Sequence, residues 1–338
     1  MIDFTLSAAA PTLAVVADDT RLYPGGGPSQ AGASRLAAAT HCDRSFAYRY
    51  GLGMFRGGSA AQAGGSLIHA GLAQHYARVG AAQKGGIVVA GEHVIDPERL
   101  GSVAEAIARE AAARGVEPDA DVVVDSRECV EQYVATYRYD DKAFSILHVE
   151  EVFSATFLCP EHTVTVLAEQ AHTLNPAGVV IAREGEGPEA TVTLKFDRYL
   201  WTTRIDLAFS AAGKTIICDH KTTARLEAKH PRIYALTSQM AGLRWLGNHV
   251  YGARFGGVLL NMIQREPPRK FARPNMDAAP ALVRDFPQNV LDTEARIEAN
   301  AARRVPFLRW PTASNELACY HRYGRCSGAD ACLWGVTP

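Results

Sequence analysis

The segment from Arg204 to Thr223 constrains the fold of this chain more than any other stretch. β-Branched and aromatic residues are frequent on both sides of Ala211-Ala-Gly213, and such residues favour strands. The glycine between the two runs favours a tight turn. The pattern therefore predicts a β-hairpin. A chain that contains this hairpin must pair and cover its strands, so we expect a sheet packed against helices.

The second strand of the hairpin ends in three chemically active residues. Side chains alternate along a strand, so Asp219 and Lys221 share one face and His220 takes the other. Asp206, on the first strand, adds a second carboxylate on the face of Asp219. Two carboxylates about 4 Å apart repel by about 4 kcal/mol at an effective dielectric constant of 20. Such a pair needs a proton, a cation or a metal, and hard oxygen ligands suit Mg²⁺ or Mn²⁺.

The pattern Asp206…Asp219-His220-Lys221 resembles the PD-(D/E)XK nuclease superfamily, and in particular its RecB-like branch. The resemblance implies that both acids and the backbone carbonyl of His220 bind the metal, and that Lys221 orients the attacking water or the phosphate. The alternative is a surface hairpin in which Lys221 merely pairs with an aspartate, because Asp-x-Lys also arises by chance.

A helix predicted to begin at the cap Ser66 carries the next site residue, His69. Ile68, Leu72 and Tyr76 recur at helical spacing, so His69 lies on or beside a buried stripe. A histidine in this position is more often a hydrogen-bonded core residue than a ligand. However, the phrase Gly65-Ser-Leu-Ile-His69 looks like the first motif of RecB-like nucleases, which implies that His69 reaches the metal.

Two further site residues follow from the resemblance. RecB-like sequences often carry an acid followed by an aromatic residue in an early strand, and Glu150 with Phe153 fits this place. Related nucleases also carry Gln-x-x-x-Tyr on a helix after the hairpin. Gln239 matches the glutamine, but leucine stands where the tyrosine is expected, so Tyr234 or Trp245 is a substitute for that contact.

The C-terminal region holds Cys319, Cys326 and Cys332 within fourteen residues, separated by polar and glycine residues. Such spacing indicates a compact thiolate site that needs a fourth ligand, for which Cys42 is the distant candidate. One N-terminal and three C-terminal cysteines around a nuclease core resemble the iron–sulfur RecB-like nucleases, which implies a [4Fe–4S] cluster. Zn²⁺ is the main alternative, and reduced core cysteines are another.

The order of predicted elements gives the fold class. A helix, strands over 144–157, 163–167 and 191–200, the hairpin, a helix over 231–250 and a strand over 255–263 follow one another. This is the α-β-β-β-α-β order of the restriction-endonuclease-like core. We expect an α/β (α+β) protein whose mixed central sheet is flanked by helices, with helical elaborations. A further long helix is predicted from about 282 to 302.

We predict three regions in the 338 residues. Residues 1–40 form a poorly defined N-terminal arm. Residues 41–270 form the nuclease core, with a helical insertion at about 100–140. Residues 271–338 form a C-terminal helix and a cysteine-rich clasp that packs back on Cys42.

Composition limits the partners. The net charge of −1 excludes a global basic surface, so nucleic acid would bind in a local groove. No signal peptide or membrane span is recognisable, which favours a cytoplasmic protein without a membrane partner and with reduced thiols. Nothing in the sequence indicates the oligomeric state.

Together these observations predict a metal-dependent DNA nuclease, most consistent with an exonuclease acting on linear ends in recombination, repair or phage DNA metabolism. A recombination or replication protein is a conceivable partner. The alternative is a non-catalytic DNA-end-binding or scaffold protein that keeps the fold. A hydrolase of the same fold with another substrate is a third reading.

Overall fold

The computed structural model describes residues 12–15, 29–53, 60–83, 86–89, 92–94, 96–312, 320–321, 324–325 and 332. The helices are α1 (Ala33–His41), α2 (Asp43–Phe46), α3 (Ala60–Ala81), α4 (Val103–Ala113), α5 (Asp121–Tyr137), α6 (His230–Ala235), α7 (Ser238–Tyr251), α8 (Pro280–Arg284) and α9 (Phe286–Ala301). The strands are β1 (Thr12–Val15), β2 (Ile87–Val89), β3 (Glu92–Val94), β4 (Ser145–Leu167), β5 (Val179–Glu184), β6 (Thr191–Ala211), β7 (Lys214–Thr223), β8 (Phe255–Gln264), β9 (Phe271–Ala272), β10 (Asn275–Met276), β11 (Tyr320–His321) and β12 (Gly324–Arg325).

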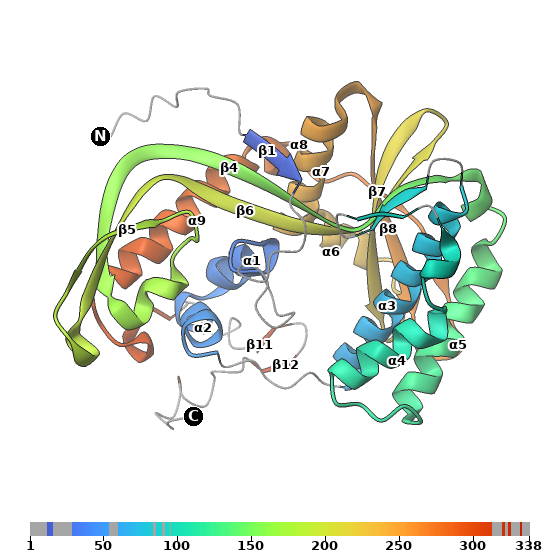
Figure 1. Ribbon diagram of the computed structural model, residues 1–338, viewed down its shortest axis with the longest axis horizontal. Coiled ribbons are helices and arrows are strands. Elements are labelled where there is room, and N and C mark those ends of the chain that lie inside the picture. The colour runs from blue at the N-terminus through green and yellow to red at the C-terminus, as the bar shows by residue number, and fades with distance from the viewer. Residues whose placement is uncertain are drawn as a thin grey trace.

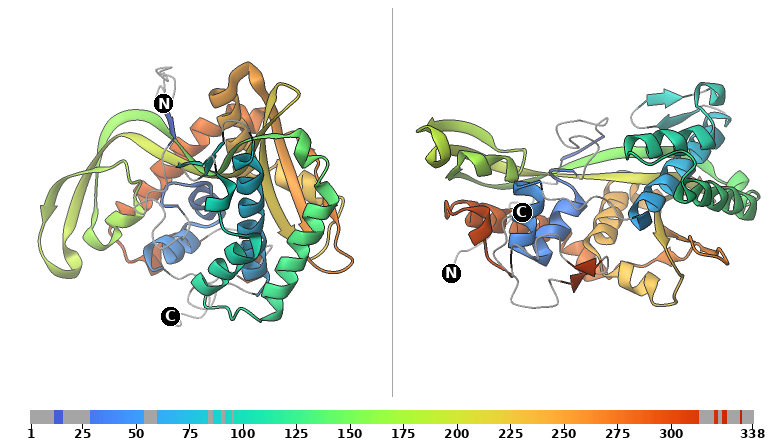
Figure 2. Two further views of the ribbon diagram at one scale, coloured as in Figure 1. Left: turned by 45° about the vertical axis from the view of Figure 1, so that its right-hand side comes forward. Right: turned by 90° about the horizontal axis from the view of Figure 1, so that it is seen from below.

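A long two-stranded ribbon, β4 with β6, runs through both lobes of the molecule (Figure 1). We call the part with α3, α4, α5, α7, β7 and β8 the core lobe, and the part with α1, α2, α9 and β5 the ribbon lobe. The view from below in Figure 2 shows the ribbon as a thin layer with helices of the ribbon lobe packed beneath it.

The central sheet has the order β10-β8-β7-β6-β4-β2-β3 and mixed strand directions. β7 pairs with β8 in parallel and β2 pairs with β4 in parallel, while the β4–β6 and β6–β7 pairs are antiparallel. The order α3, β4, β6, β7, α7, β8 reproduces the predicted α-β-β-β-α-β core. The predicted fold class, a mixed sheet flanked by helices, is therefore confirmed.

The predicted hairpin is present as β6 and β7. Its turn places Ala212 and Gly213 at φ values of 49° and 76°. A two-residue turn with positive φ at both positions matches the right-handed twist of the flanking strands. Ala212 adopts this conformation at a cost of about 1 kcal/mol, which the extended β6–β7 ladder offsets.

Several predicted boundaries are wrong. The strands predicted over 144–157 and 163–167 are one strand, because an irregularity between Leu158 and His162 absorbs the extra residues without ending the β4–β6 ladder. The prediction for 191–200 likewise missed that β6 continues into the hairpin. Helix α3 begins at Ala60, so Ser66 lies inside it and caps nothing.

The later helices are broken where single helices were predicted. The helix predicted over 231–250 is α6 and α7, because the side chain of Thr237 accepts the N–H of Met240 and starts a new helix. The helix predicted over 282–302 is α8 and α9, with Pro287 in the first turn of α9. The domain boundary predicted at residue 40 falls within α1.

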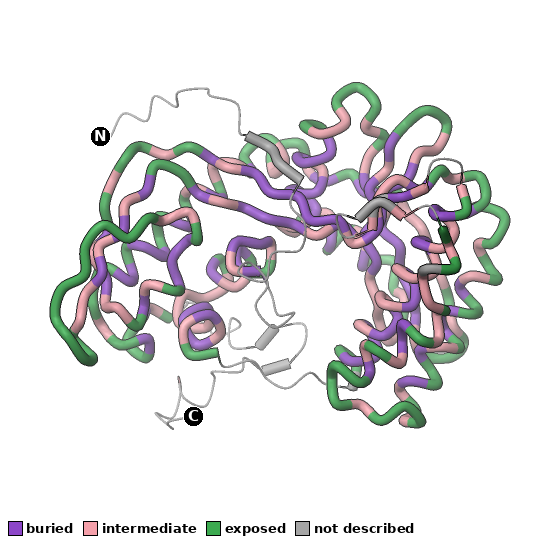
Figure 3. Tube along the Cα trace, viewed as in Figure 1, coloured by how far each residue is buried: buried purple, intermediate pink, exposed green. Residues whose placement is uncertain are grey.

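Buried residues concentrate along the middle of the ribbon and on the inner faces of the helices (Figure 3). One core cluster lies between the sheet and α7, including Trp201 and Trp245, and a second lies between the sheet and α3 and α5. A third joins α1, α2 and α9 to the ribbon through Phe46 and Trp310. No helix in the described ranges is both long and apolar enough to cross a membrane.

Candidate active site

The site lies where strands β6 and β7 separate. Their ladder ends at the pair Leu207 and Cys218, and one residue further along Asp206 and Asp219 would face each other. Instead of a backbone carbonyl, the Oδ2 atom of Asp206 accepts the backbone N–H of His220 at 2.6 Å. The carboxylate thus occupies the gap between the strands, beside the acid of the neighbouring strand.

Asp219 is buried and contacts two side chains. Its Oδ2 atom lies 2.5 Å from Nζ of Lys221, and its Oδ1 atom accepts a hydrogen bond of 2.8 Å from Nε2 of Gln239 on α7. The structure therefore brings the predicted residues Asp206, Asp219, Lys221 and Gln239 together. Lys221 also lies 5.9 Å above the ring of Tyr234, whereas Trp245 packs in the core and does not take that place.

Burial and like charge determine the protonation of these groups. Burial raises the pKa of Asp219, and the neighbouring charge of Asp206 adds to this effect although Lys221 opposes it. Burial alone would raise the pKa of Asp206 and lower that of Lys221, but nearby opposite charges outweigh it. The pKa of Asp206 is therefore lowered and that of Lys221 raised, so both are ionised at neutral pH.

His69 reaches the site from α3. Its Nδ1 atom lies 3.7 Å from Oδ2 of Asp206. The helix approaches β7 closely because Gly65 has no side chain: a Cβ atom there would lie 2.8 Å from Oγ1 of Thr222. The Gly…His motif thus has a steric basis, since the glycine permits the approach that delivers the histidine.

Glu150 faces the same cavity as Asp206 and His69. Its position in β4 is opposite Asp206 in the register with β6, and its φ of 52° is unusual for a residue other than glycine. Its Oε2 atom lies 3.9 Å from Nη1 of Arg204. Strained residues held by surrounding structure are concentrated at functional sites, which supports the choice of Glu150.

The ring of His220 lies away from Lys221, as strand alternation predicts. The amide nitrogen of Asn261 on β8 donates to its Nδ1 atom at 2.7 Å, which leaves the ring proton on Nε2. Burial lowers the pKa of His220 to about 3, so the ring is neutral. The ring of His220 is thus held by other contacts, and the ligand predicted from this residue is its backbone carbonyl.

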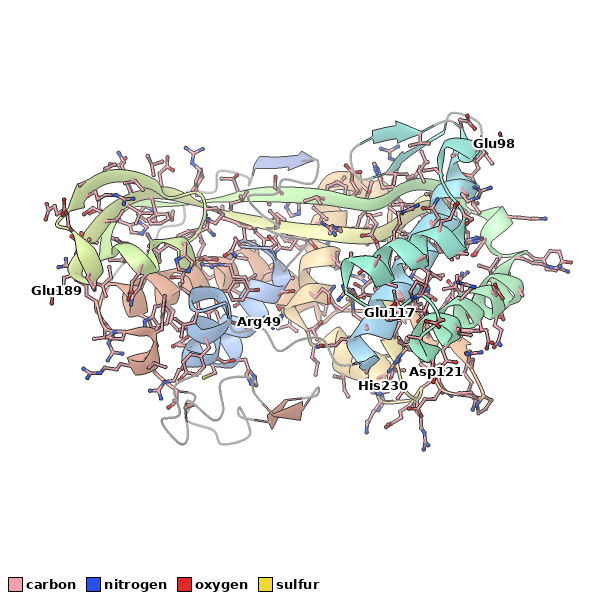
Figure 4. All side chains as sticks on the ribbon, turned by 60° about the horizontal axis from the view of Figure 1, so that its bottom comes forward. Arg49, Glu98, Glu117, Asp121, Glu189 and His230 are labelled. Carbon is pink, nitrogen blue, oxygen red and sulfur yellow. The ribbon has the colours of Figure 1, made fainter. Side chains whose placement is uncertain are left out.

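A cavity of about 1220 Å³ opens beside Asp206, and four arginines from different elements line it. These are Arg49, Arg114, Arg204 and Arg265. Arg265 begins the basic loop that follows β8, and Arg49 lies on the ribbon lobe, facing the space between the lobes in Figure 4. Asp206 at the fork and guanidinium groups around the wall suit a substrate that carries phosphates.

The residues fit a hard divalent cation by donor chemistry, since the fork between β6 and β7 offers two carboxylates and the imidazole nitrogen of His69. No group of three or more His, Cys, Asp or Glu side chains is arranged as a metal site within the ranges that the structure describes. The assignment of His69, Asp206, Asp219 and the His220 carbonyl as ligands therefore stays a prediction.

Two of the four cysteines predicted to form a clasp, Cys42 and Cys332, lie within the described residues. Cys42 precedes α2 as its N-terminal cap residue, and Sγ of Cys332 lies 3.5 Å from Nη1 of Arg44 on the same helix. Arg44 also donates from its side chain to the carbonyl of Trp310 and from its backbone N–H to that of Pro311, so it ties α2 to the segment that follows α9. Cys319 and Cys326 lie outside the described residues.

Sequence reasoning missed several residues near the site. Arg49, Arg114 and Arg204 are scattered over 155 positions and share no motif, so only the fold unites them. Asn261 lies in the predicted strand over 255–263, whose other residues are almost all apolar. A buried amide needs a hydrogen-bond partner, so this residue was the signal from which a polar contact with a neighbouring strand could have been predicted.

A family model and a solved structure match this chain. The family model described as "PD-(D/E)XK nuclease superfamily" matches residues 30–332. A crystal structure from Eubacterium rectale, of a protein with a provisional exonuclease assignment, is similar with a TM-score of 0.43 and 9% identity; the match covers 94% of this chain and 90% of that chain. No curated protein sequence matches significantly.

Proposed function

This chain belongs to the PD-(D/E)XK nuclease superfamily, and from that premise we propose that it is a metal-dependent deoxyribonuclease. The observation that carries the proposal is the fork between β6 and β7. There an ionised Asp206, which lines a cavity together with four arginines, accepts the N–H of His220, and the neighbouring Asp219 contacts Lys221.

Each residue has a distinct task in this proposal. Asp206, Asp219, His69 and the backbone carbonyl of His220 hold Mg²⁺ or Mn²⁺, which lowers the pKa of bound water and neutralises charge on the phosphate. Lys221 is held charged by Asp219 and orients the water or stabilises the developing phosphorane charge. Gln239 fixes the second acid through its hydrogen bond to Oδ1.

We further propose that the substrate is linear DNA and that digestion starts at ends, in recombination, repair or phage DNA metabolism. The four arginines support a phosphate-rich substrate, since each guanidinium can bind two phosphate oxygens. Glu150 has the geometry of an additional acid at the cavity wall, held near Arg204.

End-labelled linear DNA with Mn²⁺ tests the nuclease proposal. The wild-type protein should shorten the DNA, while Lys221→Ala should bind it with similar affinity and not cut it. Lys214→Ala is the matched control, because this lysine lies on the same strand but donates to the carbonyl of Ala253 away from the site. Equal cutting by Lys221→Ala refutes the assignment, and binding without cutting by wild type favours a DNA-end-binding scaffold.

We also propose that Cys42, Cys319, Cys326 and Cys332 hold a [4Fe–4S] cluster, with Zn²⁺ as the competing metal. The approach of Cys332 to Arg44, two residues after Cys42, supports a clasp between the chain's distant segments. Such a cluster would restrain a loop of nearly the whole chain. Anaerobic purification followed by absorbance and iron and zinc analysis tests it; Cys326→Ala should lose colour, metal and stability together.

A further inference from the structure

The ring of His220 lies between two rings of α3. It meets His69 edge to face, with centroids 5.7 Å apart and planes at 83°, and it stacks on Tyr76 with centroids 5.9 Å apart and planes at 16°. His69 and Tyr76 are seven residues apart, which is close to two helical turns, so they lie on one face of α3. The His220 ring therefore separates α3 from β7 at the level of the site.

Tyr76 is itself fixed from behind by a buried polar cluster. Its hydroxyl lies 2.9 Å from the hydroxyl of Tyr133 and donates to Oδ2 of Asp141 at 3.1 Å. Nη2 of Arg273 donates to the same Tyr76 oxygen at 2.8 Å. Arg273 also forms an ion pair with Asp141 at 2.8 Å and lies 3.5 Å from the ring centroid of Tyr137.

The other edge of the His220 ring is fixed by the neighbouring strand. Asn261, which is directly opposite in the β7–β8 register, donates to Nδ1 at 2.7 Å. His220 and Tyr76 are each about 1% exposed, so solvent does not compete with these contacts. A ring held on its edge by an amide and on its face by an anchored tyrosine has little freedom to tilt.

We propose that His220 and Tyr76 are positioning residues that hold the His69 ring toward Asp206, with the Asp141–Arg273 ion pair as their anchor. The inference deepens the proposed function, because it assigns the alignment of a predicted metal ligand to residues that touch neither metal nor substrate. Residues behind a ligand commonly change metal affinity or activity by about tenfold or more when they are altered.

The test uses three variants of the full chain. Tyr76→Leu removes the stacked ring, and Tyr76→Phe keeps the ring but loses the hydroxyl. Tyr199→Leu is the matched control, since Tyr199 is also a buried tyrosine but packs on Phe196 in the ribbon lobe, away from His220. The readouts are the His69 ring resonance by NMR without metal, identified by its loss in His69→Gln, Mn²⁺ affinity by EPR, and kcat and KM on linear DNA.

Tyr76→Leu should move the His69 resonance, weaken Mn²⁺ binding about tenfold and lower kcat with KM for DNA unchanged. Tyr76→Phe should restore the resonance and most of the affinity, and Tyr199→Leu should leave both at wild-type values. An unmoved His69 resonance in Tyr76→Leu, or an equal change in Tyr199→Leu, overturns the proposal.

If Tyr76→Leu does not fold, Asn261→Leu serves instead, because it frees the edge of the His220 ring and should move the same resonance. A different result contradicts the proposed nuclease function: wild-type protein that binds Mn²⁺ but cuts no DNA. The His69 resonance still decides the positioning roles in that case.

Discussion

Two acidic sites in this molecule, Glu294 in one and Asp206 with Asp219 in the other, differ in how their charge is balanced. In the ribbon lobe, Glu294 receives two hydrogen bonds from Arg35, at 2.9 and 2.7 Å, and Arg35 also donates to the carbonyl of Thr173 at 2.7 Å. In the core lobe, Asp206 and Asp219 lie beside each other and share one lysine. Arg35 balances the charge of Glu294 within the protein, whereas Asp206 of the second site lines the cavity.

This difference separates a structural charge from a functional one. A bidentate arginine satisfies Glu294 in place, so nothing remains for a ligand to do. At the fork, burial and to a lesser extent the charge of Asp206 raise the pKa of Asp219, so the folded protein disfavours the charged form of this acid. A bound cation would favour that form.

Asp219→Asn should give the largest effect on activity and almost none on stability. We expect cutting to fall about a thousandfold, because the metal and Lys221 both lose a charged partner. The folded pKa of Asp219 is raised, so its stabilising contribution is present below pH 3.8 and is lost as the pH rises through the folded value. The neutral amide should therefore change the free energy of unfolding at pH 7 by less than about 1 kcal/mol. Urea denaturation and DNA digestion measure the two effects, and a large loss of stability contradicts the comparison.

Arg35→Met should show the opposite pattern. The side chains of Arg35 and Glu294 are 0% and 2% exposed. Removing Arg35 leaves the charge of Glu294 buried and unpaired, which should lower the free energy of unfolding by about 4 kcal/mol. The double variant Arg35→Met, Glu294→Leu should recover most of this loss, because apolar side chains can replace a buried ion pair. Urea unfolding of both variants checks the prediction. DNA cutting by folded Arg35→Met at low temperature should remain at the wild-type rate.

Acid should weaken the protein through His220. Its folded pKa of about 3 lies below its ordinary value of 6.5, so the stability gained by keeping the ring neutral is complete above pH 6.5 and is lost as the pH falls toward 3. Within this window His220 should lower the free energy of unfolding by about 1.4 kcal/mol per pH unit. Denaturation at several pH values should show that His220→Asn lacks this component of the slope. Parallel slopes for the two proteins would mean that the ring is protonated in the folded state.

Gln239→Ala should have the smallest effect, a loss of about tenfold in cutting rate through a loosened Asp219. Gln288→Ala is a matched control, because Gln288 makes a similar 2.7 Å bond to Asp292 on α9, remote from the fork. Steady-state rates on linear DNA distinguish them. Comparable losses in the two variants would remove the assigned role of Gln239.

The sequence was informative where local pattern and chemistry coincide. The hairpin, with Asp206 and Asp219 on facing strands, followed from alternation and a glycine turn, and the helical insertion predicted at about 100–140 contains α4 and α5. Contacts between residues that only the tertiary fold brings together could not be predicted from the sequence. Arg35 looked like part of an undefined arm, and its partner Glu294 lies 259 residues away. Tyr76 read as an apolar stripe residue, since nothing local reveals that its hydroxyl meets Arg273.

The continuous pairing of β4 with β6 also determines how the protein unfolds. Both strands contribute to the packed interiors of the two lobes, so neither half has a complete sheet of its own. We expect one cooperative melting transition, and cleavage of the ribbon between the lobes should release no independently folded fragment.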